Sequence, residues 1–240
     1  MNAPKISTII VIICILIIGL YAMGEVNYFS SKISVERDIE SPVIVIPSIG
    51  VDEKINEVSL NQGVMHDSGS ATPTNGDVII FGHRTLQGSP FLRLNELQNG
   101  DEIILEWPGI GEVTYTVTSS TVVPATYTIP TSEGGNSIYL VTCDPIGSTE
   151  NRLIIQGELT NQGQLNEEII QNNPQESNAL YITAGFLILG LIFSFIYPKD
   201  NRAYILATVL IVTAVLLYCC INPIPSELIY DKIIFLNGGM

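Results

Sequence analysis

Three side chains of the types used in thiol acyl transfer each lie where a predicted strand begins or ends. Cys143 closes one apolar run, His83 follows another, and Arg152 opens a third. A thiolate is a nucleophile, an imidazole can return a proton to a leaving amine, and a guanidinium favours the thiolate and binds an oxyanion. An unperturbed thiol, with a pKa of about 8.5, is only a few per cent ionised at neutral pH. A positive neighbour would therefore matter for the reactivity of Cys143.

Each of these residues has a plainer interpretation when it is taken alone. A histidine after a strand is more often structural, and an isolated arginine is more often a surface charge. The prediction of chemistry therefore depends on the three occurring together at strand ends, where β folds build their sites.

The cysteine count adds a second observation about Cys143. Of the four cysteines, Cys14, Cys219 and Cys220 lie in long apolar runs, where free cysteine behaves as a small apolar residue. Structural cysteines in oxidising compartments outside the cytoplasm usually occur in pairs. The single remaining cysteine indicates a reactive thiol, a bridge to another chain or a buried inert thiol, and the count does not choose among them.

The elements that must position these residues are predicted to be short strands. Val113, Tyr115 and Val117 alternate with threonines, which is the period of a half-buried strand. A short apolar run between Pro42 and Pro47 suits an edge strand, because proline cannot donate to a ladder. Strands are predicted at residues 42–47, 77–82, 101–107, 111–119, 137–142 and 152–159, with a short helical pattern at 91–97 and a helical patch at 167–170.

The last two predicted strands suggest how the site is assembled. If residues 137–142 and 152–159 pair as a hairpin, Cys143 and Arg152 face each other at its mouth, with β-carbons roughly 5 Å apart. No long amphipathic helix occurs between Pro42 and Leu159, so the pattern favours a closed or sandwich-like all-β domain.

Three charge-free apolar runs are long enough to cross a membrane as helices: 6–23, 180–197 and 203–221. Lys5 precedes the first, and Lys199 and Arg202 lie between the second and third. Positive charge favours the cytoplasmic side, so residues 1–5 and 198–202 are predicted to be cytoplasmic. A cleaved signal peptide ending near Ala22-Met23-Gly24 is the alternative for the first run.

This topology predicts a multi-pass plasma-membrane protein with an extracellular domain. The outer part divides into a stalk at 24–41, a β domain at 42–159 and a linker at 160–179, and the tail at 222–240 is also outside. The chain carries a net charge of −14, which argues against nucleic acid as a partner. Solubility is the plainer reason for this charge.

The motifs, taken in order, resemble those of the sortase family of extracytoplasmic cysteine transpeptidases. The resemblance covers residues 42–159. It is carried by Gly82-His83-Arg84 after a strand, Leu140-Val141-Thr142-Cys143 at a strand end, Arg152 opening the next strand, Asn75-Gly76-Asp77, Phe91-Leu92-Arg93-Leu94 with Leu97, and Gly100-Asp101-Glu102-Ile103.

The resemblance implies an eight-stranded sortase-type β-barrel with short helices, accompanied here by one N-terminal and two C-terminal transmembrane helices. Cys143 would attack the backbone carbonyl of a C-terminal sorting signal in a surface protein and form a thioacyl-enzyme. His83 would act as general acid and base, and Arg152 would steady the oxyanion or the substrate. An amine of the cell wall or of a pilin-like protein would then resolve the intermediate.

Two further positions acquire expected roles from the resemblance. Thr142 is expected to contact the substrate or to orient Arg152. Tyr139 stands where the family often has threonine, and it is expected to pack or to touch the substrate. No metal or cofactor is predicted, because Asp101, Glu102 and Glu133 lack the spacing of a calcium loop. His66 is interpreted as a loop residue near the cleft.

The rival hypothesis is a non-catalytic, membrane-tethered β module that binds a surface partner, with Cys143 buried or bridging two chains. A third hypothesis is an enzyme resembling the L,D-transpeptidases, which use similar residue types. The histidine- and glycine-rich stretch expected shortly before its cysteine is absent from this sequence.

Overall fold

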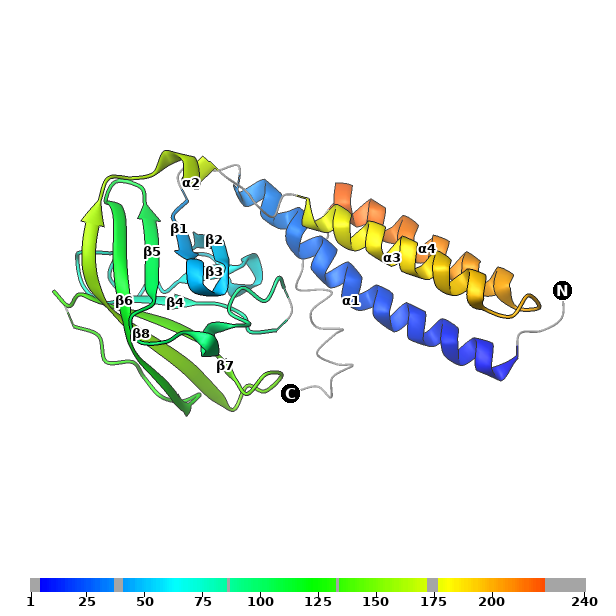
Figure 1. Ribbon diagram of the computed structural model, residues 1–240, viewed down its shortest axis with the longest axis horizontal. Coiled ribbons are helices and arrows are strands. Elements are labelled where there is room, and N and C mark those ends of the chain that lie inside the picture. Colours follow the sequence, from blue (N-terminus) through cyan, green and yellow to red (C-terminus); the bar gives the residue numbers. More distant parts are fainter. Residues whose placement is uncertain (1–4, 37–40, 86, 133, 172–176, 223–240) are drawn as a thin grey trace. The chain divides into compact units, whose positions relative to one another are not determined.

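The protein is described by a computed structural model that covers residues 5–36, 41–85, 87–132, 134–171 and 177–222. The chain forms two compact units, one made of Met1–Ile33 and Gln175–Met240 and the other of Ser34–Pro174 (Figure 1). The helices are α1 (Ile6–Glu36), α2 (Glu167–Gln171), α3 (Asn178–Ile196) and α4 (Arg202–Ile221), with short 3-10 helices η1 (Pro47–Ile49), η2 (Leu60–Gln62) and η3 (Leu94–Glu96).

The second unit is a closed, mixed β-barrel of eight strands in the order β1-β2-β3-β4-β7-β8-β6-β5. Most neighbours are antiparallel, whereas β2 with β3 and β4 with β7 are parallel. This confirms the predicted eight-stranded β-barrel. The strands are β1 (Val43–Ile46), β2 (Val51–Asn56), β3 (Val64–His66), β4 (Val78–Phe81), β5 (Glu102–Trp107), β6 (Gly111–Pro124), β7 (Ser137–Asp144) and β8 (Asn151–Gly163).

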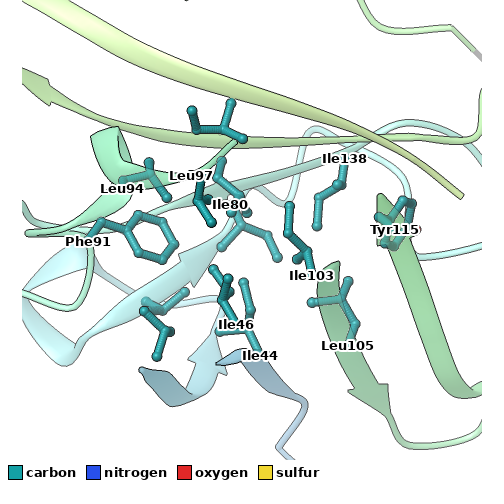
Figure 2. Close-up of a cluster of buried hydrophobic side chains, with 14 of the residues drawn as sticks. Ile44, Ile46, Ile80, Phe91, Leu94, Leu97, Ile103, Leu105, Tyr115 and Ile138 are labelled. Carbon is teal, nitrogen blue, oxygen red and sulfur yellow. The ribbon is translucent and has the colours of Figure 1, made fainter. Parts of the chain in front are cut away.

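The barrel interior follows the alternation seen in the sequence. Val113, Tyr115 and Val117 of β6 point into a core shared by all the strands. Figure 2 shows Phe91 and Leu94, from the segment between β4 and β5, lying against the strand residues of this core. Phe91 and Leu94 are fully buried, so this short segment closes part of the barrel. The helical pattern predicted at 91–97 is a set of turns with the single 3-10 turn η3.

One prediction about the strands is wrong, and two strands were not predicted. β1 is not an edge strand, because it pairs with β2 on one side and β5 on the other. Its flanking prolines lie just outside the ladder, and the Pro42 carbonyl still accepts a hydrogen bond from Ile55 N at 2.7 Å. Moreover, the sequence patterns did not identify β2 or β3. The first carries three consecutive charged residues between Val51 and Ile55, and the second has only three residues.

His66 is another correction, because it is a strand residue and not a loop residue. It ends β3 and is only 3% exposed. Its Nδ1 lies 3.1 Å from Glu57 Oε1, its Nε2 lies 3.0 Å from the carbonyl oxygen of Ala71, and its ring meets that of Trp107 edge-on. These contacts indicate a structural histidine.

Within its described residues, the first unit contains three helices, α1, α3 and α4, that are long and apolar enough to cross a membrane. They pack through small residues: a β-carbon on Gly19 of α1 would lie 2.6 Å from Val212 of α4. A β-carbon on Gly190 of α3 would lie 2.5 Å from Val209 of α4. Glycine at such points lets apolar helices approach closely in a bilayer. Thr8 of α1 also lies within hydrogen-bond distance of the Tyr197 hydroxyl, at 3.1 Å.

Some elements extend beyond the boundaries that the sequence predicts. Helix α1 continues past Met23 to Glu36, through most of the predicted stalk. Strand β8 runs on to Gly163, and the predicted patch at 167–170 is α2, so the predicted linker begins with ordered structure. The tail after Asn222 lies outside the described residues.

Candidate active site

The parallel pairing of β4 and β7 brings His83 and Cys143 to the same end of the barrel. Phe81 lies beside Val141 in the register, and Gly82 N donates to the Val141 carbonyl at 3.1 Å. Because parallel strands end at the same edge, the residues that follow on β4 approach those that end β7. These two residues are 60 positions apart in the chain, and this pairing places them at neighbouring strand ends.

Arg152 reaches this end through the antiparallel pairing of β7 with β8. The register places Cys143 directly opposite Arg152, as expected from the predicted hairpin. Arg152 Nη1 donates to the carbonyl of Thr149, in the connection between the strands, at 2.9 Å and to that of Asn151, the first residue of β8, at 3.0 Å. The guanidinium carries five N–H donors, so it can support this loop and also meet a substrate oxygen.

Cys143 lies on the outer face of the barrel and is partly exposed. Strand residues alternate between the two faces, and Leu140 of β7 points into the core. The opposite face of the sheet carries a second set of apolar side chains, here called the outer apolar cluster. Its members are Ile79, Val141 and Ile154, with Phe81, Val123, Ile129 and Tyr139 packed against them.

Tyr139 therefore lies on the same face of β7 as Cys143, with Val141 between them on that face. It lies beside Ile79 of β4 and Gln156 of β8. Burial, and secondarily the charge of Asp77, raises the pKa of the Tyr139 phenol, so the hydroxyl stays protonated at neutral pH. Tyr139 thus presents a neutral, partly apolar side chain on the strand that leads to the thiol.

Thr142 lies on the inner side of the same strand and is only 3% exposed. Its hydroxyl donates to the Gly82 carbonyl at 2.8 Å. Gly82 precedes His83, so this hydrogen bond ties the strand end that carries the thiol to the one that carries the imidazole. This hydrogen bond gives Thr142 a structural role between the two strand ends, and its contact with substrate or with Arg152 stays a prediction.

Gly82 must be glycine because the ring of Phe91 lies against its backbone. A β-carbon at this position would lie 2.4 Å from Phe91 Cδ2. The Phe91 amide also donates to the His83 carbonyl at 3.0 Å. Phe91 is therefore the group that requires the absence of a side chain at position 82.

Burial also determines the proton affinity of His83. Desolvation lowers the pKa of its imidazole below the usual 6.5, because the charged form loses hydration. The neutral ring is therefore the main form at pH 7, and it is suited to take a proton from a thiol.

The lowered pKa of His83 predicts a pH dependence of stability. Below pH 6.5 the unfolded chain binds a proton at His83 that the folded site resists. The contribution of neutral His83 to the free energy of unfolding is therefore present above pH 6.5 and is lost as the pH falls. We expect the free energy of unfolding of wild type, taken relative to that of His83→Gln, to fall between pH 7.5 and 5.5, by at most about 1.4 kcal/mol per pH unit. Denaturant unfolding at each pH measures this difference. A difference that stays constant over the range would contradict the prediction.

Asp77 anchors the segment that borders the outer apolar cluster. Its carboxylate accepts hydrogen bonds from Ser132 N at 2.8 Å, Ser132 Oγ at 3.0 Å and Ser137 N at 3.0 Å. Ser132 lies between β6 and β7, as does Ile129 of the cluster, and Ser137 is the first residue of β7. In the sequence, a charged residue at the start of an apolar strand could have indicated that Asp77 has a structural partner. It could not identify the partners, which are more than fifty residues away in the chain.

Arg84 is the second residue whose contacts the sequence did not reveal. It is only 6% exposed, and its guanidinium forms an ion pair with the Asp144 carboxylate. Nη1 also donates to the Cys143 carbonyl at 3.2 Å, and Nη2 donates to Asn95 Oδ1 at 2.9 Å. A charged residue directly after the strand-end histidine could have indicated a partner nearby, but not which one.

Among the described residues, no group of three or more His, Cys, Asp or Glu side chains is arranged to hold a metal ion. Glu133, one of the acidic residues considered for calcium, lies outside those residues. The side chains at this end of the barrel include a thiol, an imidazole and a guanidinium, which are groups that suit acyl transfer.

Comparisons with known proteins agree with this description. The family model of the sortase domain matches residues 39–160. Similar solved structures include sortase C-1 of Actinomyces oris, with 30% identity over 50% of this chain and 73% of that one and a TM-score of 0.45. Sortase A of Corynebacterium diphtheriae has 26% identity over 51% and 61%, with a TM-score of 0.47.

A further similar structure is that of Clostridium perfringens sortase C with the C-terminal cell wall sorting motif. It has 26% identity over 50% of this chain and 69% of that one, with a TM-score of 0.46. A search of curated protein sequences found no match.

Proposed function

The chain belongs to the sortase family, and from this premise we propose that it is a membrane-bound cysteine transpeptidase. It cleaves a sorting signal in a surface protein through a thioacyl-enzyme and transfers the acyl group to an amine of the cell envelope or of another protein. The observation that carries the proposal is the convergence of His83, Cys143 and Arg152 on one end of the barrel.

The first half of the reaction forms the thioacyl-enzyme. Cys143 Sγ attacks the backbone carbonyl of the sorting signal, and neutral His83 takes the thiol proton. The carbonyl π electrons move onto oxygen, and the Arg152 guanidinium stabilises the resulting oxyanion. When the C–N bond breaks, His83 gives the proton to the departing amine. The lowered pKa of His83 assists this last step, because a weaker base is a stronger acid once it is protonated.

The second half repeats these steps with a new amine. The incoming amine attacks the thioester carbonyl, and His83 takes its proton. The C–S bond then breaks, and His83 gives this proton to the sulfur, which returns Cys143 as a thiol. Partial burial of His83 removes water from the proton carrier. The partly buried members of the outer apolar cluster, including Tyr139, offer the approaching peptide an apolar surface beside the thiol.

The three long apolar helices support a membrane location for this enzyme. We propose that α1, α3 and α4 all cross the plasma membrane, with Lys5 and the Lys199–Arg202 turn in the cytoplasm. This arrangement places the barrel outside the cell, where surface proteins with a C-terminal sorting signal and envelope amines are available. Labelling of single introduced cysteines in intact cells would test the orientation.

The proposal predicts a covalent intermediate on one named atom. Full-length protein in detergent, incubated with a panel of sorting-signal peptides, should gain the mass of the acyl fragment on the peptide that contains Cys143. Adding a free peptide amine should discharge the adduct and give the ligated product. Peptides with the scissile region scrambled are the control. If folded protein gives neither an adduct nor a ligated product with any peptide of the panel, the proposed reaction is wrong.

A further inference from the structure

Two carboxyl groups face each other on the outer side of the barrel, near the turn that joins β5 to β6. Glu106 of β5 pairs directly with Glu112 of β6 in the register. Leu105 and Val113, their neighbours in the chain, point into the core, so the alternation of a strand puts both glutamates on the other face. Side chains opposed in this way have β-carbons roughly 5 Å apart, and like charges at that distance are destabilising.

Glu106 is fully buried although it lies on the outer face. The chain that leaves β8 lies against it, because Asn166 N donates to Glu106 Oε2 at 2.9 Å. A β-carbon on Gly163, the last residue of β8, would lie 3.4 Å from Glu112 Oε1. The end of β8 and the residues that follow it therefore run beside both carboxyl groups.

The pair needs a proton to satisfy its oxygen atoms. Ionised carboxylates only accept hydrogen bonds, and Glu106 Oε1 has no donor among the described residues. Burial raises the pKa of the Glu106 carboxyl; the Asn166 hydrogen bond opposes this rise, and the charge and hydrogen bond of Glu112 add to it. One proton shared by the two glutamates turns one carboxyl into a donor and removes the repulsion between them.

Asn166 links this pair to α2. Its backbone N–H binds Glu106, and its side-chain Oδ1 accepts a hydrogen bond from Glu168 N, in the first turn of α2, at 3.1 Å. In the chain, α2 follows β8 and precedes α3 (Figure 1). Release of Asn166 from Glu106 would therefore free the start of the connection between the barrel and the apolar helices.

We propose that Glu106 and Glu112 form a proton-dependent clasp, which holds the chain after β8 on the barrel while they share a proton and releases it when both are ionised. The raised pKa of Glu106 means that the docked state binds the proton more tightly than the released state. Docking is therefore strongest at low pH and weakens as the pH rises through the raised value. This inference is independent of the role proposed for Cys143.

The surroundings of the pair leave Glu112 as the group that faces Glu106 directly. On the opposite side of Glu106, β1 carries no charged residue, and its Val43 separates Glu106 from Lys54 of β2 in the same row. Other charged groups on the adjoining elements are Glu102 of β5 and Glu167 and Glu168 of α2.

The test follows amide hydrogen exchange at residues 164–171 in full-length protein in detergent, between pH 5 and 8. Each rate is divided by the intrinsic exchange rate at that pH, so that only protection is compared. In wild type we expect the protection of this segment to fall by about fivefold to tenfold over the range, since each pH unit above the docked pKa weakens docking by at most about tenfold. Amides of the β6 core should keep their protection.

Three variants identify the clasp as the cause. Glu106→Gln keeps an oxygen that can accept from Asn166 N but cannot ionise, so protection should be independent of pH and within about threefold of the wild-type value at pH 5. Glu112→Gln removes the like charge, so protection at pH 8 should be about threefold above wild type. Glu102→Gln is the matched control, because Glu102 is an exposed glutamate on the same face of β5, opposite Thr116, and its pH profile should match wild type.

Each outcome decides for or against the clasp. Protection at residues 164–171 that does not change with pH in wild type overturns it, and so does a Glu106→Gln variant that keeps the wild-type pH dependence. If Glu106→Gln does not fold, Glu112→Gln decides, since a profile identical to wild type in that variant is incompatible with a shared proton. A changed profile in Glu102→Gln would show that general surface charge, and not this pair, controls the segment.

Discussion

Replacing Cys143 with alanine is expected to abolish transfer of a sorting-signal peptide to an amine. The substitution removes the atom that forms the thioester, so the two easier steps of covalent catalysis collapse into one uncatalysed step. We expect kcat to fall by at least about a thousandfold. Catalytic residues that act together depend on the nucleophile, so its loss removes nearly all of the rate enhancement that they give jointly. The measurement is the rate of ligated product formation by mass spectrometry, together with the absence of any acyl adduct.

The fold should survive this change, because Cys143 is partly exposed on the outer face and loses only its sulfur. Thermal unfolding close to that of wild type would show this. Cys14→Ala is the matched control, since Cys14 is an exposed thiol of α1, and it should retain full activity. An alanine variant at position 143 that still ligates peptides would end the thioacyl mechanism.

Gly82→Ala is expected to reduce stability and activity together. The new β-carbon would lie 2.4 Å from Phe91 Cδ2, and Phe91 is fully buried in the barrel core, so the ring cannot move into solvent. Overpacking of this kind costs roughly 1–3 kcal/mol. Gly82 also accepts the Thr142 hydrogen bond and precedes His83, so its displacement should lower kcat/KM by between about tenfold and a hundredfold.

Two further variants identify the cause of this effect. Phe91→Leu removes part of the ring, so Gly82→Ala combined with Phe91→Leu should cost less than the sum of the two single changes. Gly69→Ala is the matched control, because its nearest contact would be an ordinary 3.5 Å to Asp67, and it should change neither the melting temperature nor the turnover. Strictly additive losses in the double variant would show that the Phe91 contact is not the reason.

The sequence was informative where the physical signal is local. The alternation in Val113, Tyr115 and Val117 depends only on the two-residue period of a strand, and these side chains are in the core as predicted. The three apolar runs are recognisable because a bilayer demands length and apolar composition within one segment. The opposition of Cys143 and Arg152 followed from a single hairpin, whose strands are close in the chain.

The sequence was misleading or silent where distant segments pair. The prolines around β1 suggested an edge, but barrel closure gives this strand a partner on each side. β3 has too few residues to show a period, and it exists because β2 and β4 flank it. His66 is buried for the same reason, since its surroundings come from other parts of the chain.

The sequence by itself therefore determined the residue types of the candidate site, the hairpin that joins two of them and the three membrane-length helices. Only the tertiary structure decided which groups surround the thiol. The parallel register of β4 and β7 brings Gly82 against Thr142 and Arg84 against Asp144, across some sixty residues of chain. No local pattern encodes such pairs, because their energy comes from contacts that exist only after the barrel has closed.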